Sequence, residues 1–189
     1  MSAQDSKLFV ISGPSGAGKG TLVTRVRERR SNLGLTVSAT TRAPRKGEVD
    51  GVNYFFLTRE EFDRRVANGE FVEWAEVHGN CYGTLVSEVT SKLASGSSLI
   101  LEIDVQGALQ VKERFPEAVL IFIKPPSLEV LRERLVGRGT ETPEMIELRM
   151  ANAADELALA DRYDDVVVND DLDRATDELV RVLDMHERI

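Results

Sequence analysis

Residues 13–21 read Gly13-Pro14-Ser15-Gly16-Ala17-Gly18-Lys19-Gly20-Thr21, a glycine-rich stretch with a lysine near its end. It follows an apolar run at residues 8–11 that predicts a strand, and it precedes a helical pattern at residues 21–30. Glycines let the backbone bend tightly and turn its N–H groups inward, and a helix N-terminus adds about half a positive charge. A lysine placed here reaches the outer phosphates of a nucleotide as a point charge. The stretch therefore predicts a phosphate-binding loop, with Lys19 as a catalytic residue.

One position departs from the usual pattern of such loops. The lysine is followed by Gly20, where Ser or Thr is usual, and Thr21 comes one residue later. The hydroxyl of Thr21 can hold Mg²⁺ directly or through a water molecule, and the loop alone leaves this choice open. We expect Thr21 to be the metal-binding residue of the loop and Mg²⁺ to be the cofactor.

The composition excludes several classes of protein. The 189 residues include 42% hydrophobic side chains, enough for the core of about one domain. The net charge of −8 argues against binding to nucleic acid or to an anionic membrane. The single cysteine, Cys81, cannot form an internal disulfide, and the apolar run near the start is too short for a signal peptide or a membrane span. We expect a cytoplasmic protein, either a monomer or a homo-oligomer.

Short apolar runs alternate with helical patterns along most of the chain. The runs lack the in/out alternation of a half-exposed strand, so we expect strands that helices cover on both faces, as in a parallel sheet. The predicted strands are residues 8–11, 99–103, 119–123 and 165–168. The predicted helices are residues 21–30, 105–115, 127–136, 142–161 and 172–187. This order predicts an α/β fold with a central parallel sheet flanked by helices.

Residues 35–95 do not follow this alternation of buried strands and helices. We predict strands at residues 35–39, 54–57 and 70–75, with a short helix between the second and the third. The sequence Thr58-Arg59-Glu60-Glu61 is a capping box that begins this helix, and Gly69 directly follows its end. We interpret residues 35–95 as an inserted α+β nucleotide-binding lobe, called here the small lobe. Residues 1–34 and 96–189 then form the core domain, with a lid at about residues 126–160.

A second anion site is predicted at Thr40-Thr41-Arg42-Ala43-Pro44-Arg45-Lys46-Gly47. Guanidinium groups bind phosphate oxygens in pairs, and two of them suit a dianion. A solvated charged loop is the alternative interpretation of this turn. That alternative weakens once a phosphate loop is present elsewhere, because phosphoryl transfer needs both a donor site and an acceptor site.

The whole chain resembles guanylate kinases, which are P-loop kinases of the nucleoside monophosphate group. The Gly-Lys-Gly-Thr ending of the loop is itself more typical of that group than of GTPases. The resemblance rests on GPSGAGKGT at 13–21, SATTRAPRKGEVDGVNYFF at 38–56, GEFVEWAEVHGNCYGT at 69–84, LEIDVQG at 101–107, FIKPPS at 122–127, GRGTET at 137–142 and VVVNDDL at 166–172.

The resemblance implies roles for individual residues. For ATP binding it implies the loop residues 13–21 and Asn169, which matches a position near the donor adenine. For the phosphate of GMP it implies Arg42, Arg45, Tyr54 and Tyr82, and for the guanine base Ser38, Glu73, Thr84 and Asp104. For the lid and its flanks it implies Arg134, Arg138 and Arg149, of which Arg138 and Arg149 join Lys19 and Arg42 as catalytic residues.

The chemistry of guanine supports part of this set independently. The N1–H and the exocyclic amine of guanine are both donors, so a carboxylate such as Glu73 or Asp104 can accept from that edge, whereas adenine presents an acceptor at N1. Asp104 directly follows a predicted strand, where ligand sites of open α/β sheets lie. The alternatives are an exposed strand carboxylate for Glu73 and a polar cap for Asp104. Arg134 has the alternative of pairing with Glu129 or Glu133 on its own helix.

The expected activity is transfer of the γ-phosphoryl group of ATP to GMP, giving ADP and GDP, a step of purine nucleotide metabolism. Two other functions stay open at this point. One is a kinase of the same architecture with another acceptor, such as AMP or a sugar phosphate. The other is a non-catalytic guanylate-kinase-like interaction module that binds peptides, although such modules usually have a degraded phosphate loop and this chain keeps Lys19.

Overall fold

A five-stranded parallel sheet forms the centre of the computed structural model, which describes residues 6–77, 79–137 and 142–187. Its strands lie in the order β2-β7-β1-β8-β9, so the chain fills one side of β1 before it crosses to the other. Ligands of open α/β sheets bind outside the carboxyl ends of the strands at such a crossing point. The strands are β1 (Leu8–Ser12), β2 (Gly34–Leu35), β7 (Leu99–Glu102), β8 (Val119–Lys124) and β9 (Asp165–Val168).

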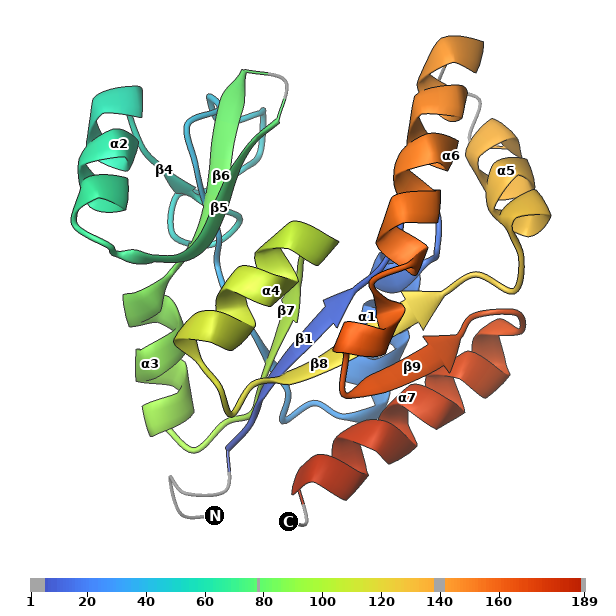
Figure 1. Cartoon of the computed structure of the whole chain (residues 1–189). Coiled ribbons are helices and arrows are strands. Elements are labelled where there is room, and N and C mark those ends of the chain that lie inside the picture. The colour runs from blue at the N-terminus through green and yellow to red at the C-terminus, as the bar shows by residue number, and fades with distance from the viewer. Residues whose placement is uncertain (1–5, 78, 138–141, 188–189) are drawn as a thin grey trace.

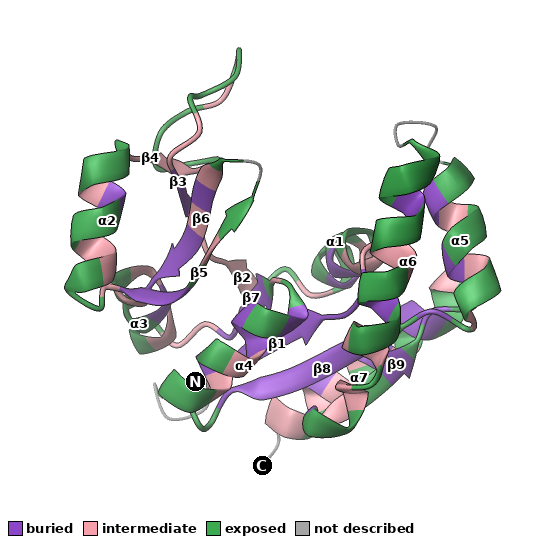
Figure 2. Cartoon of the chain, turned by 45° about the horizontal axis from the view of Figure 1, so that its top comes forward, coloured by how far each residue is buried: buried purple, intermediate pink, exposed green. Residues whose placement is uncertain are grey.

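Helices cover both faces of this sheet, which confirms the predicted α/β class. Alternate residues of β1 point to opposite faces: Phe9 and Ile11 pack with the first and last helices, and Leu8 and Val10 pack on the other side. The central strands are consequently buried on both faces (Figure 2). The helices are α1 (Lys19–Arg29) and α7 (Leu172–Glu187) on the first face, and α3 (Val86–Ala94) and α4 (Val105–Arg114) on the second.

The small lobe contains a separate four-stranded sheet in the order β4-β3-β6-β5. Its strands are β3 (Ala39–Thr40), β4 (Phe55–Phe56), β5 (Phe71–Val77) and β6 (Asn80–Leu85). Sequence patterning missed β6, because Asn80 and Gly83 are poor strand formers. Gly83 is nevertheless required there, since a Cβ would lie 2.8 Å from the carbonyl oxygen of Glu73 on the paired strand.

The predicted strand at residues 35–39 is wrong as a single element. Leu35 belongs to β2 of the central sheet, whereas Ala39 begins β3 of the small lobe. Helix α3 was also not predicted, and its Val89 is buried in the core of the central sheet. The division into a core domain and a small lobe stays a prediction, and these two segments lie where the two parts join.

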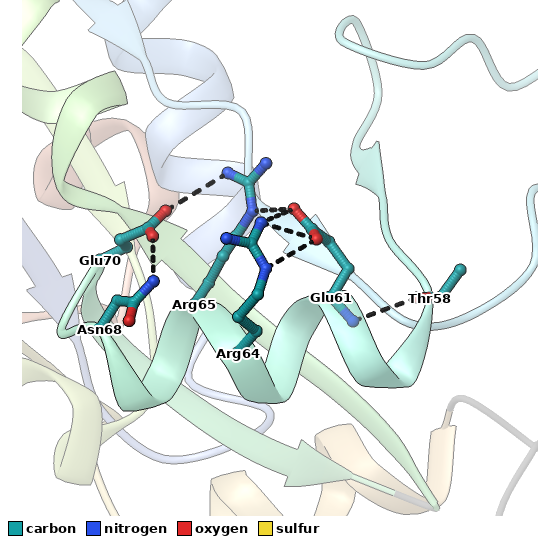
Figure 3. Close-up of polar contacts among 6 residues, drawn as sticks. All are labelled: Thr58, Glu61, Arg64, Arg65, Asn68 and Glu70. Atoms are coloured by element: carbon teal, nitrogen blue, oxygen red, sulfur yellow. Dashed lines mark hydrogen bonds and ion pairs between the residues drawn. The ribbon is translucent and has the colours of Figure 1, made fainter.

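Helix α2 (Arg59–Ala67) begins where the capping pattern predicts. The hydroxyl of Thr58 accepts a hydrogen bond of 3.1 Å from the backbone N–H of Glu61. The Glu61 carboxylate pairs with Arg64 and Arg65 one turn further along the helix (Figure 3). The helix ends at Ala67 with Asn68 as its C-cap, and Gly69 follows with a positive φ of 68°.

Two further helices, α5 (Leu128–Gly137) and α6 (Pro143–Leu157), stand beside each other at the upper right of Figure 1, across from α2 at the upper left. Leu131 and Leu135 of α5 pack against Ile146 and Ala153 of α6. Helix α6 is shorter than predicted, since a separate 3₁₀ turn at Ala160–Arg162 occupies the end of the expected range.

Candidate active site

The phosphate loop lies at the carboxyl end of β1 and leads directly into α1. Gly13 and Gly18 have φ values of 140° and 90°, which side chains rarely adopt. Neither position has room for a Cβ, because it would collide with the carbonyl oxygen of Ile123 at Gly13 and with the side-chain amide of Asn169 at Gly18. The glycine pattern of the sequence is therefore a packing requirement of the loop as well as a conformational one.

Lys19 folds back over the loop. Its ammonium Nζ donates to the carbonyl oxygen of Gly13 at 2.6 Å and to that of Pro14 at 3.1 Å. The N–H of Ala17 donates to the Pro14 carbonyl at 3.1 Å and closes the turn. A positive charge thus lies at the mouth of the loop, where the dipole of α1 also favours an anion.

A cavity of about 430 Å³ opens on one side of the loop. The side-chain amide of Asn169 donates to the carbonyl oxygen of Ala17 at 2.7 Å, and Arg134 Nη2 donates to the carbonyl oxygen of Asn169 at 2.7 Å. Arg134 therefore joins α5 to the loop after β9, and the alternative of pairing with Glu129 or Glu133 along its own helix is not what the structure shows. The lining residues are Gly16, Gly18, Thr21, Arg134, Gly137, Asn169, Asp170 and Leu172.

A second cavity, of about 310 Å³, opens beside Ser15 of the loop. Arg149 of α6 lines it and donates a hydrogen bond to the Ser15 hydroxyl. Its lining residues are Ser15, Met145, Leu148, Arg149, Asn152 and Glu156. Arg138, the third arginine predicted near the transferred phosphate, lies outside the described residues.

The predicted acceptor-phosphate residues meet on the small lobe. Arg42 follows β3, and its guanidinium lies 5.4 Å from the centre of the Tyr54 ring. Tyr82 comes from β6, pairs with Thr40 in the sheet register and packs edge-on against Tyr54 with ring centres 6.2 Å apart. Arg45 joins the same turn through its backbone N–H. The sheet register therefore gathers an arginine and two phenol groups from three separate segments.

Sequence analysis missed Glu48, which holds this turn in place. Its Oε1 pairs with Arg42 Nη2 at 2.8 Å, and its Oε2 accepts a hydrogen bond of 2.7 Å from the N–H of Arg45. Hydrogen bonding from Arg42 and Arg45 lowers the pKa of Glu48. A carboxylate three residues after Arg45 in a basic turn was the available signal.

Two of the four predicted base-reading residues, Glu73 and Thr84, meet on the same lobe. Glu73 and Thr84 are register partners on β5 and β6, and the Thr84 hydroxyl donates to Glu73 Oε1 at 2.7 Å. Both side chains are buried. Burial raises the pKa of Glu73, the Thr84 hydrogen bond opposes this, and the nearby charge of Asp104 raises it further.

Asp104 performs the capping role that was its alternative interpretation. Its Oδ1 accepts a hydrogen bond of 2.7 Å from the N–H of Gly107 and caps α4. A Cβ at Gly107 would lie 3.2 Å from Glu73 Oε2 and 3.4 Å from Asp104 Oδ1, so both carboxylates approach the same glycine. Capping and base reading are compatible, because the cap uses one of the two oxygens of Asp104. Ser38 precedes β3, and its carbonyl oxygen accepts from the N–H of Phe55 at 2.9 Å.

Glu102 is a second residue that sequence analysis missed. It ends β7, the strand beside β1, and its carboxylate lies 3.3 Å from where a Cβ of Gly20 would be. Burial raises the pKa of Glu102, and the Lys19 ammonium lowers it. An acid directly after the apolar run Leu99-Ile100-Leu101 was the signal that could have placed it at the phosphate loop.

A glycine-lined anion cradle on the first helix of a parallel α/β sheet, with a second cationic site beside a separate four-stranded sheet, defines a P-loop kinase of the nucleoside monophosphate class. A sequence model described as guanylate kinase matches residues 5–186. The chain is 57% identical to guanylate kinase of Gloeobacter violaceus over 94% of this chain and 87% of that protein. It is 52% identical to guanylate kinase of Halalkalibacterium halodurans over 97% of this chain and 90% of that protein.

A solved structure agrees with this assignment. The crystal structure of guanylate kinase from Anaplasma phagocytophilum superposes with a TM-score of 0.73 at 37% identity, covering 96% of this chain and 86% of that one. The chain belongs to the guanylate kinase family, as the resemblance implied. It is accordingly an ATP-dependent phosphotransferase with GMP as its acceptor.

Proposed function

We propose that this chain transfers the γ-phosphoryl group of ATP to GMP by holding ATP at the phosphate loop and GMP on the small lobe. Hydrogen bonds of Asn169 and Arg134 around the cavity of about 430 Å³ support placing the donor nucleotide there. The single observation that carries the acceptor site is the buried Glu73–Thr84 pair, an acceptor group matched to the donor edge of guanine. Both substrates are then bound by separate parts of one chain.

The transfer needs positioning and neutralisation of charge more than covalent chemistry, because its transition state is loose. Lys19 and the loop N–H groups hold the donor phosphates, and Arg42 and Arg45 with the Tyr54 and Tyr82 hydroxyls hold the phosphate of GMP. That phosphate is already an anionic nucleophile, so a strong general base is not required. Arg149 lies beside the loop through its contact with Ser15, and it covers the migrating group. Arg138 shares this proposed role.

The residues around the loop fit Mg²⁺. The exposed Thr21 lines the donor cavity, and Glu102 supplies a carboxylate beside Gly20. In the described part of the chain, no three His, Cys, Asp or Glu side chains group as a metal site. Mg²⁺ needs only one or two protein oxygens when substrate phosphates provide the rest, so either Thr21 or Glu102 would supply what the protein must contribute. Bound there, Mg²⁺ neutralises charge that develops on the transferring phosphates.

A coupled assay of ADP release tests the function directly. We expect turnover with ATP and GMP together, little with ATP alone, and little with AMP or a sugar phosphate as the acceptor. Lys19→Ala is expected to lower kcat to below about 1% of the unmodified enzyme while the thermal unfolding temperature stays close to it. Near-normal turnover of Lys19→Ala contradicts the donor assignment, and GMP binding without any turnover indicates a non-catalytic module.

Location and assembly stay predictions of the sequence. Among residues 6–77, 79–137 and 142–187, no helix combines the length and the apolar character needed to cross a bilayer. We keep the cytoplasmic location and the choice between monomer and homo-oligomer as proposals, which fractionation and size-exclusion chromatography with light scattering test.

A further inference from the structure

The last turn of helix α4, which packs on the central sheet, is hydrogen-bonded to the small lobe. Arg114 donates from Nη1 to the carbonyl oxygen of Phe71 at 3.0 Å and from Nη2 to that of Gly69 at 2.5 Å. Phe71 begins β5, which lies at one edge of the four-stranded sheet. Edge strands carry backbone carbonyl groups that no neighbouring strand pairs. The planar guanidinium therefore binds two carbonyls of the small lobe from a helix of the central sheet.

Strand β5 is also packed between two hydrophobic cores. Val72 is buried in the cluster of the central sheet, which includes three residues of α4, namely Val105, Ala108 and Val111. Phe71, the residue before it, is buried in the cluster of the small lobe instead. Successive side chains of a strand point to opposite faces, so the start of β5 contributes to both cores.

The first turn of α4 lies beside the base-reading carboxylate of the same strand. A Cβ at Gly107 would lie 3.2 Å from Glu73 Oε2. Gly107 and Arg114 are about two helical turns apart, which places them on one face of α4. Strand β5 therefore meets this face at two points, with Arg114 at one and Glu73 at the other.

The relative position of the two base-reading carboxylates depends on how β5 is held against α4. The hydrogen bond from Thr84 joins two strands of the small lobe, so it fixes Glu73 within that lobe. Asp104 instead caps α4. The apolar contact at Val72 attracts the strand to the helix without direction, whereas the two hydrogen bonds of Arg114 are directional and set its position along the helix.

We propose that Arg114 is a positioning residue that holds β5 along α4 and thereby keeps Glu73 where it meets the guanine base together with Asp104. This inference rests on the proposed function, in which both carboxylates read the base. Arg114 acts through the backbone of β5 and does not touch the substrate. Its loss should therefore weaken the use of GMP through Glu73 and leave ATP binding unchanged.

A double-mutant cycle on the full chain, measured by steady-state kinetics, tests the proposal. Arg114→Ala is expected to lower kcat/KM for GMP about threefold to tenfold and to leave KM for ATP unchanged. In a Glu73→Gln background the same change is expected to lower kcat/KM for GMP by less than about twofold, because the group that it positions is already lost. The matched control is Lys112→Ala, which removes another cation of α4 whose Nζ donates to the carbonyl oxygen of Ala118 at 2.7 Å, outside the small lobe. We expect this control to keep kcat/KM for GMP within about twofold.

Three outcomes overturn the proposal: an unchanged kcat/KM for GMP in Arg114→Ala, an equal loss in both backgrounds, and a loss that Lys112→Ala reproduces. An equal loss in both backgrounds means that Arg114 supports the fold and does not act through Glu73. If Arg114→Ala does not fold, Arg114→Lys takes its place in the cycle, since its ammonium lacks the planar fork that binds both carbonyls, and the same outcomes decide. Failure of the proposed function is distinguished by the absence of GMP turnover, or of any effect of Glu73→Gln, while Arg114 is intact.

Discussion

The Thr84 hydroxyl donates a hydrogen bond of 2.7 Å to Glu73 Oε1, and both side chains are buried between β5 and β6. The bond fixes the orientation of the carboxylate and leaves Oε2 beside Gly107. Glu73 thereby keeps acceptor capacity for a ligand, although burial raises its pKa. A buried carboxylate that a ligand must complete is costly to the empty protein and selective toward the ligand.

Specificity for the base should depend on Glu73. Glu73→Gln replaces an acceptor oxygen with an NH₂ group, so we expect kcat/KM for GMP to fall by at least about tenfold and the ratio of GMP to AMP to fall with it. Acceptor kinetics with both nucleotides measure this. Glu76→Gln, an exposed position on the same strand, is the control. Unchanged discrimination shows that Glu73 does not read the base.

Stability should respond to the same substitution in a pH-dependent way. The raised pKa of folded Glu73 means that its ionisation is penalised in the folded state, so its contribution to stability falls as pH rises from the unfolded value of about 4.3 through the folded value. Glu73→Gln removes that penalty. We expect the variant to gain thermal stability relative to the unmodified protein at pH 7.5 and to gain less at pH 4. An equal gain at both pH values contradicts the interpretation that the buried Glu73 carboxylate is penalised when it is ionised. Thermal unfolding followed by circular dichroism measures it.

The acceptor-phosphate turn should behave as one unit. Arg42→Ala removes a phosphate ligand, and Glu48→Ala removes the carboxylate that holds Arg42 and the N–H of Arg45. We expect both to raise KM for GMP by about tenfold or more with little change for ATP, because the donor site is elsewhere. The double variant should be less impaired than the product of the single effects, since the two residues act together. Separate titrations of the two nucleotides measure this, and additive effects contradict a positioning role for Glu48.

Ion pairs between α1 and α7 should differ in how much they contribute to the free energy of unfolding. Arg25 pairs with Asp173 where both side chains are exposed, whereas Arg30 pairs with Asp184 at 2.6 Å and with Glu187 where Arg30 is 14% exposed. Exposed pairs contribute about 0–1 kcal/mol, and hydrogen bonds to less exposed charged groups contribute about 1.5–3 kcal/mol. We expect Arg30→Ala to lower the free energy of unfolding clearly and Arg25→Ala to lower it little. Denaturant unfolding measures both, and equal losses contradict the distinction.

Four of the five strands of the central sheet and the phosphate loop were predictable because their signals are local. The strand at residues 165–168 and the helix at residues 172–187 match β9 and α7 residue for residue, since uninterrupted apolar runs and helical periodicity depend on neighbours in the chain. The start of α2 at Thr58 was predictable for the same reason. Glu48 and Glu102 were not predicted because a single acidic residue forms no recognisable sequence pattern. Their roles become visible only when the fold shows which groups each carboxylate contacts.

The sequence alone determined the chemistry that this protein has available: the glycine-lined cradle with Lys19, the paired arginines, and the carboxylates that match guanine. The tertiary structure decided which of these groups meet. Register between β5 and β6 sets Thr84 opposite Glu73, the turn at Glu48 orients Arg42, and α6 brings Arg149 to the Ser15 hydroxyl of the phosphate loop. The physical reason is that bends and cradles arise from adjacent residues, whereas hydrogen bonds and charge interactions across the site depend on how distant segments pack.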